Sequence, residues 1–428
     1  MQRLRQLTQS RFIRSVLIVA TGTAGAQAIT MAFAPVITRL YGPEAFGLLG
    51  TFMAILTVLT PMAALTYPIA IVLPKQDEDA RGLAKLSILL AAATSSLALI
   101  LLLTWGDWLA EQLGAGAISQ YLWLIPFAML FSALHQVMEQ WLIRHRQFRI
   151  TARVAVIQSV LLNSAKVGAG FFLPLASVLI ILQTLTSGLH ALLLWLGIRG
   201  TRTQDATSAK TSCIKQLAIK HKDFPRYRAP EVTINAASQG LPILMLAAFF
   251  GPASAGFYTL AQTVMGIPAG LIGKSVGDVF YPRISEAANN REALYPLVRK
   301  ATLLLAAVGF VPFATVIACG PWLFSFVFGS EWETAGEYAR WLAVWLFFLF
   351  INGPSVKSIP IIKAQAFQLS YTSLTIAIRL ATLFLAYKIY QSEIAAIIGF
   401  GISGALINII LISIVLKKCR KFDIGENK

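Results

Sequence analysis

The sequence predicts an all-α membrane protein of about 12 transmembrane helices, arranged as two six-helix bundles related by pseudo-twofold symmetry. The first reason is composition, since 57% of the residues are hydrophobic and only 13% are charged, which exceeds the apolar share of soluble domains. The second is length, because the apolar runs of about 20 residues match the hydrocarbon core of a bilayer. The third is periodicity. The runs lack the two-residue alternation of barrel strands, which leaves helices as the way to satisfy backbone hydrogen bonds in lipid.

The apolar runs divide into two sets of six. The expected helices of the first set are 13–38, 46–73, 83–105, 118–142, 152–173 and 175–198. Those of the second set are 231–250, 256–280, 301–328, 334–353, 365–388 and 393–416.

The distribution of charge supports an even number of crossings. Of the 36 Lys and Arg residues, 30 fall in alternate joints and the two termini, whereas the opposite joints hold only Arg39, Arg340 and Lys388. Basic residues accumulate on the cytoplasmic side of membrane proteins, so both termini are expected in the cytoplasm. The opposite joints, which hold seven acids, are expected on the outer side.

The formal net charge of +17 is explained by this topology and by attraction to anionic lipid headgroups, so nucleic-acid binding is not expected. Cys213, Cys319 and Cys419 lie far apart and show no CxxC spacing, which argues against a zinc site or a disulfide framework. The basic N-terminus lacks a small-residue cleavage site after its apolar run, so that run is expected to remain as the first helix.

The chain also contains an internal repeat. The segment YGPEAFGLLGTF at 41–52 reappears as FGPASAGFYTLA at 250–261, with Gly42, Pro43 and Gly47 matched at one offset. We therefore expect an N-terminal bundle (1–198), a cytoplasmic linker with an amphipathic segment (199–230), and a C-terminal bundle with a basic tail (231–428). Six helices per repeat give both halves the same orientation.

The repeated segments, together with PIAIVLP at 68–74 and LFSFVFGSEWETAGEYARWLA in the second half, carry a resemblance over nearly the whole chain. The sequence resembles the MOP superfamily of multidrug, oligosaccharidyl-lipid and polysaccharide exporters, and within it the Wzx-type polysaccharide or O-antigen flippases. The resemblance implies a MATE-like fold at the inner membrane, for surface polysaccharide or lipopolysaccharide synthesis. It also implies translocation of an oligosaccharide linked to undecaprenyl pyrophosphate towards the periplasm. Membrane lipids and polysaccharide polymerase machinery are the further partners it implies.

An anionic pyrophosphate would require cations along a cavity between the halves. Lys166, Lys274 and Arg379 lie inside the expected helices, several turns from the ends in the case of Lys166 and Arg379. Asn163 shares a helix face with Lys166 and is a candidate ligand for a sugar hydroxyl or the phosphate. Lys166 and Arg379 lie at equivalent places in the two halves, so we expect both to line the cavity. Snorkelling, or pairing of Lys274 with Asp278, is the alternative for these cations.

Two further sets of residues are candidates for transport steps. His135 and Glu139 share a helix face and form a candidate proton or ion relay, although pairing of Glu139 with nearby basic residues is the more ordinary explanation. Arg39 is a candidate exit guide for the headgroup, with interfacial anchoring favoured. His190 is expected to be a packing residue.

No Walker loop, HExxH or GxSxG motif is present. The sequence therefore predicts a transporter rather than an enzyme, with no catalytic residue, metal or cofactor. Two alternatives stay open: a MATE-like, cation-coupled multidrug exporter, which should place acids in the cavity, and a membrane-embedded polysaccharide polymerase, which should carry a large outer polar loop.

Overall fold

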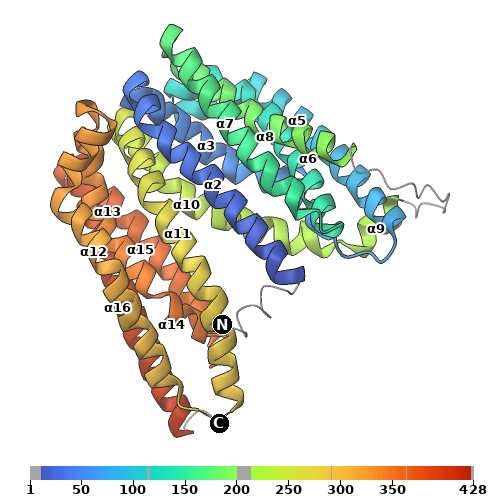
Figure 1. Cartoon of the computed structure of the whole chain (residues 1–428). Coiled ribbons are helices and arrows are strands. Elements are labelled where there is room, and N and C mark those ends of the chain that lie inside the picture. The colour runs from blue at the N-terminus through green and yellow to red at the C-terminus, as the bar shows by residue number, and fades with distance from the viewer. Residues whose placement is uncertain (1–10, 113–115, 200–213, 291, 363, 426–428) are drawn as a thin grey trace. The chain divides into compact units, whose positions relative to one another are not determined.

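The structure is a computed structural model that describes residues 11–112, 116–199, 214–290, 292–362 and 364–425. Within these ranges the chain is helical and has no strand (Figure 1). Ten of the described helices are long and apolar enough to cross a membrane. The expected all-α membrane architecture is confirmed.

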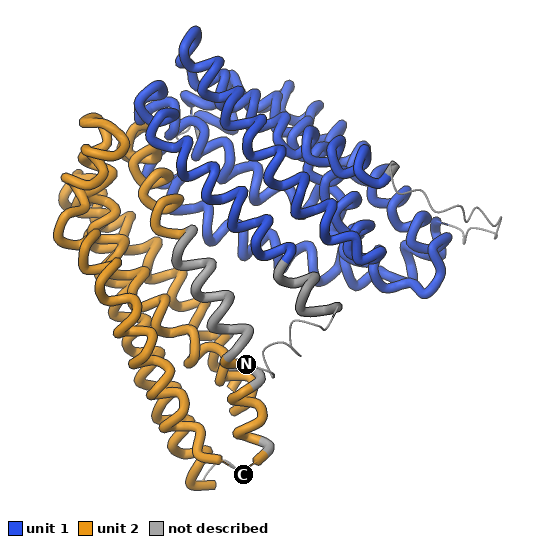
Figure 2. The backbone as a smooth tube through the Cα atoms, viewed as in Figure 1, with its two compact units in different colours: residues 1–248 blue, residues 249–428 orange. Residues whose placement is uncertain are grey.

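The chain forms two compact units, residues 1–248 and 249–428 (Figure 2). The elements of the first are α2 (Arg11–Leu40), α3 (Pro43–Ala63), α4 (Tyr67–Ala70), α5 (Asp77–Gln112), η1 (Gly116–Leu124), α6 (Ile125–Arg144), α7 (Phe148–Phe172), α8 (Ala176–Arg199), α9 (Ile214–Lys220), η2 (Phe224–Arg228) and most of α10 (Ala229–Phe250). Those of the second are α11 (Pro252–Asn289), α12 (Leu294–Phe328), η3 (Ser330–Trp332), α13 (Glu333–Ile351), α14 (Gly353–Ser358), α15 (Gln365–Tyr390) and α16 (Glu393–Ile424).

The internal repeat is visible in how helices pair within each unit. In unit 1, α6 packs against α3, α5 and α8, and α7 packs against α8. In unit 2, α13 packs against α11, α12 and α16, and α15 packs against α16. The repeated Gly-Pro dipeptides begin the equivalent helices α3 and α11, with proline in the first turn, where its missing N–H costs no hydrogen bond. Gly251 has φ +92°, a conformation that favours glycine.

Small residues bring helices of one unit close together. A Cβ atom on Gly22 of α2 would lie 2.5 Å from the Cβ of Ala152 on α7. A Cβ atom on Gly336 of α13 would lie 2.4 Å from the carbonyl oxygen of Gly320 on α12. Such contacts are typical of membrane helices, which associate through close backbone packing rather than through a hydrophobic effect.

The helix expected over 46–73 is interrupted, and that boundary was wrong. It ends at Ala63 and resumes as the short α4, with Leu65 and Thr66 in the left-handed region at φ 50° and 58°. Pro68 has no N–H to donate, and the carbonyl oxygen of Ala64 instead accepts from Tyr67 N at 3.0 Å.

The amphipathic segment of the linker is partly buried against protein. Leu217 of α9 is 2% exposed and packs with Tyr67 and Ile71 at the interruption. Tyr67 OH donates to the carbonyl oxygen of Ala218 (3.1 Å), and Thr66 Oγ1 donates to that of Phe224 (3.2 Å). One face of α9 is therefore packed against the rest of unit 1, and the basic residues of this segment lie on its exposed side.

Candidate functional site

Lys166 is held in place by the first copy of the repeated segment. The buried Tyr41, which precedes the Gly-Pro dipeptide, donates from its hydroxyl to the carbonyl oxygen of Lys166 at 2.9 Å. Its ring also packs against Gly170, one turn further along α7, where a Cβ atom would lie 2.8 Å from the ring. Tyr41 thus fixes the backbone of α7 at the lysine, a role that the sequence pattern did not reveal.

The ammonium group of Lys166 contacts a neutral partner. Its Nζ donates to Gln183 Oε1 of α8 at 3.5 Å, and no ion pair joins Lys166 to an acid among the described residues. A lysine without a counter-ion inside a membrane protein is unfavourable unless water or an anion reaches it. The binding of an anionic ligand by Lys166 stays a prediction.

Asn163 is engaged in helix packing. It is 5% exposed, and its Nδ2 donates to Thr30 Oγ1 (3.2 Å) and to the carbonyl oxygen of Ser159 (2.7 Å). Ser159 Oγ and Thr30 Oγ1 also lie 3.0 Å apart. In this conformation Asn163 stabilises the contact between α2 and α7 one turn before Lys166.

Arg379 of α15 lies in an aromatic corner. Its Cζ is 3.8 Å from the ring centroids of both Trp345 (α13) and Phe400 (α16), and the planes of these two rings meet at 75°. Tyr258 of α11 packs edge-on against Phe400. Aromatic faces attract a guanidinium group without neutralising its charge.

The hydrogen-bonding capacity of Arg379 is only partly used. Its Nε and Nη2 are buried and have no hydrogen-bond partner within the described part of the chain. Arginine presents its donors as a planar fork that matches phosphate oxygens. Among the described residues, Arg379 therefore combines a charge that has no acidic partner with two donor atoms that have no acceptor. Its approach to Lys166 stays a prediction, because each residue is described within its own unit.

The structure provides less information on the two other predicted cations, Lys274 and Arg39. The side chain of Lys274 lies outside the described residues. Arg39 is exposed near the end of α2, which is compatible with either role predicted for it.

The structure brings His135 together with His190 rather than leaving His190 alone. Their ring centroids lie 4.3 Å apart, between α6 and α8. Glu139 has no ion pair within the described ranges, and Arg144, the neighbouring basic residue of α6, is held by Asp77 instead (2.8 Å). No periodicity within one helix could have revealed the contact between the two histidines.

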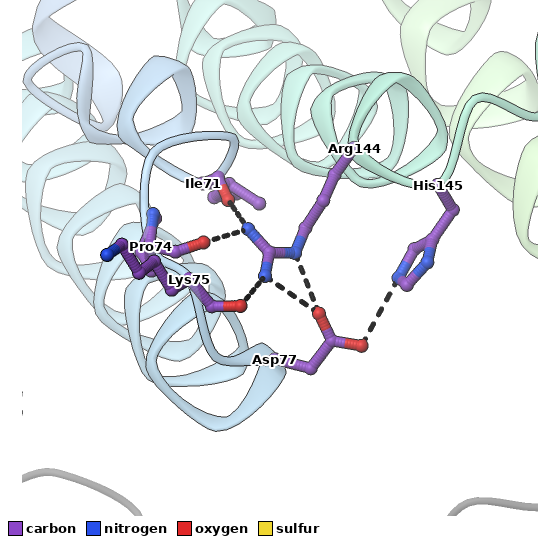
Figure 3. A network of polar contacts seen from close by, with 6 residues as sticks. All are labelled: Ile71, Pro74, Lys75, Asp77, Arg144 and His145. Atoms are coloured by element: carbon purple, nitrogen blue, oxygen red, sulfur yellow. Dashed lines mark hydrogen bonds and ion pairs between the residues drawn. The ribbon is translucent and has the colours of Figure 1, made fainter.

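Arg144 is the centre of a polar network in unit 1 (Figure 3). Its guanidinium group donates to the carbonyl oxygens of Ile71 (3.2 Å), Pro74 (2.6 Å) and Lys75 (3.4 Å), and to the Asp77 carboxylate. His145 Nε2 lies 3.9 Å from the other carboxylate oxygen of Asp77. The network ties the turn between α4 and α5 to the end of α6.

Solved structures with this architecture define the class. An inward-facing MATE family multidrug resistance transporter of the MOP superfamily matches with a TM-score of 0.70 and 13% identity, over 92% of this chain and 96% of the other. The lipid II flippase MurJ in an inward closed conformation matches with a TM-score of 0.69 and 12% identity, over 95% of this chain and 90% of the other. The protein is thus a multi-pass membrane protein with the fold of the MOP superfamily, as the resemblance implied.

The family follows from the sequence. A family model described as polysaccharide biosynthesis protein matches residues 36–337, and the chain belongs to this family. A curated relative, the succinoglycan biosynthesis transport protein ExoT of Rhizobium meliloti (strain 1021), is 23% identical over 358 residues, which cover 79% of this chain. The chain spans 66% of the length of that relative.

Proposed function

We propose that this protein is a flippase that carries an oligosaccharide linked to undecaprenyl pyrophosphate from the cytoplasmic to the periplasmic leaflet of the bacterial inner membrane. It would do so by alternating access of its two halves, with both termini in the cytoplasm. The product would feed the synthesis of a surface polysaccharide.

One observation carries the proposal: two cations on equivalent helices of the repeat, Lys166 and Arg379, lack an acidic partner among the described residues. A pair of cations without counter-ions is suited to an anion and unsuited to a cationic drug. A diphosphate with oxygens at both ends could contact one cation from each half.

The relatives support this substrate class. The relative from Rhizobium is named as a transport protein of succinoglycan biosynthesis, and one structural neighbour is named as a lipid II flippase. The chain spans only part of the first relative and shares little sequence identity with the second. These two proteins therefore support the class of cargo, and they do not specify the particular glycolipid.

Reconstitution tests the proposal. A lipid-linked oligosaccharide is added to one leaflet of vesicles that contain the purified protein, and a sugar-modifying enzyme is placed on the other side. The protein should move the glycolipid to the enzyme, and the double variant Lys166→Met/Arg379→Ala should not. Protein-free vesicles measure the background. If the protein leaves the glycolipid in place and instead exports a cationic dye such as ethidium, the flippase proposal is wrong and the multidrug exporter takes its place.

A further inference from the structure

Helices α6 and α8 each carry a stripe of polar side chains. Helical spacings of three, four and seven residues place side chains on one face. The stripe of α6 contains Ser132, His135 and Glu139, and that of α8 contains Gln183, Ser187 and His190.

The two stripes face each other, as two contacts between them show. Ser132 Oγ donates to Ser187 Oγ at 3.3 Å, and the rings of His135 and His190 lie 4.3 Å apart at an angle of 37°. The α8 stripe begins at Gln183, whose Oε1 accepts the hydrogen bond from Lys166. The stripes therefore form a polar track from the predicted substrate cation to the histidine pair and on to Glu139.

The histidine pair suits the binding of a single proton. Imidazole is the side chain whose charge changes between about pH 5 and pH 8, and two rings in contact repel each other when both are charged, so they titrate as a unit. His190 Nε2 is buried and has no hydrogen-bond partner within the described residues, which leaves a nitrogen free to exchange a proton.

Few other charged groups lie on the packed helices at this depth. On α6 they are Glu139 and Arg144, the latter held by Asp77. Helix α7 carries Arg149 and Arg153 near its start and Lys166 further along, and α8 ends at Arg199. Helix α3 has no titratable residue after Glu44, and α5 has none between Lys85 and Asp107. The ionisable neighbours of the histidine pair along the track are therefore Glu139, on α6, and Lys166, which is connected through Gln183.

We propose that the facing stripes of α6 and α8 are a proton track, and that the His135–His190 pair is its proton-binding site, coupled to anion binding at Lys166. This inference rests on the proposed function, since it assumes that Lys166 receives the pyrophosphate. Protonation of the pair adds a positive charge to the track and strengthens anion binding. By linkage, anion binding then promotes uptake of a proton by the pair.

The four histidines of the chain provide a matched test. The affinity of the full-length protein for inorganic pyrophosphate is measured in detergent at about pH 8 and about pH 5.5, within the range where histidine changes charge. His135→Gln/His190→Gln is compared with His145→Gln, which alters a histidine at the end of α6. Pyrophosphate itself gains protons over this interval, so the readout is the ratio of wild-type to variant affinity at each pH.

On acidification, the ratio of wild-type to double-variant affinity for pyrophosphate should rise roughly five- to tenfold, at the lower end of couplings between sites. His145→Gln should behave as wild type. Proton uptake on binding, measured by comparing buffers of different ionisation enthalpy, should fall in the double variant only. If the double variant keeps the full pH response, or if His145→Gln removes it, the proton track is wrong while the anion site stands. If no variant and no pH gives pyrophosphate binding, the anion site itself fails, and the coupling with it.

Discussion

The guanidinium carbon of Arg379 lies 3.8 Å from the ring centroid of Trp345, and a second ring, that of Phe400, lies at the same distance. These contacts hold the cation without neutralising it, since cation–π attraction is provided by the ring quadrupole rather than by a counter-charge. A cation kept in this way retains its capacity for an anionic ligand.

Arg379→Lys should lose much of the transport activity although it keeps the positive charge. Lysine lacks the planar fork that stacks on aromatic rings and binds phosphate oxygens in pairs. A desolvated cation–π contact is worth about 1–2 kcal/mol, which corresponds to about a tenfold loss. Initial rates of glycolipid translocation in vesicles measure the effect. Lys388→Ala, on the same helix, is the control; equal loss in both variants would contradict a specific role for Arg379.

Lys166 and Arg379 should act on the same ligand. If one pyrophosphate contacts both, Lys166→Ala and Arg379→Ala each break a shared interaction, and the double variant should be less impaired than the product of the single losses. A double-mutant cycle on pyrophosphate affinity gives the coupling energy, expected at about 1 kcal/mol or more. Strictly additive losses would show that the two cations serve separate ligands.

Gly336→Ala should destabilise unit 2. The added Cβ would meet the backbone oxygen of Gly320 at 2.4 Å, and such overpacking costs about 1–3 kcal/mol. The midpoint of thermal unfolding in detergent, monitored by size-exclusion chromatography, should be lower than that of the wild-type protein. Gly168→Ala is the matched control, because a Cβ atom at this glycine would meet no atom of a neighbouring helix within 4 Å; an unchanged midpoint for Gly336→Ala would contradict the close approach of α12 and α13.

Arg144→Met should loosen the turn between α4 and α5. The variant leaves the carbonyl oxygens of Ile71 and Pro74 and the Asp77 carboxylate without this donor. Hydrogen bonds to charged groups contribute about 1.5–3 kcal/mol when they are buried. The contribution is smaller here, because Asp77 is half-exposed. Limited proteolysis should cut near residues 71–77 faster than in wild type. Arg146→Met, an exposed neighbour, should leave the rate unchanged, and the same protection in both variants would count against the network.

The sequence predicted much of the fold because long apolar runs and alternating charge leave few arrangements. The helix expected over 393–416 is observed as α16, and that over 365–388 as α15. The interruption at Leu65 and Thr66 was missed because it involves two left-handed residues and contacts with α9 and η2, which belong to tertiary structure.

The candidate site was predicted only in part. Lys166 and Arg379 could be chosen because charge inside an apolar run is rare and costly. Their surroundings could not, since helical spacing shows which residues share a face but not which helix lies opposite. Trp345 beside Arg379, Tyr41 beside Lys166 and His190 beside His135 all belong to this second kind of contact.

The most direct test of the central claim is the amount of undecaprenyl-linked oligosaccharide in cells that lack this protein, measured together with surface polysaccharide. We predict that the intermediate accumulates, that surface polymer is lost, and that wild-type protein and Lys388→Ala restore both, whereas Lys166→Ala and Arg379→Ala, made at normal levels, do not. Unchanged glycolipid together with increased sensitivity to cationic drugs would contradict the account and identify the protein as a drug exporter.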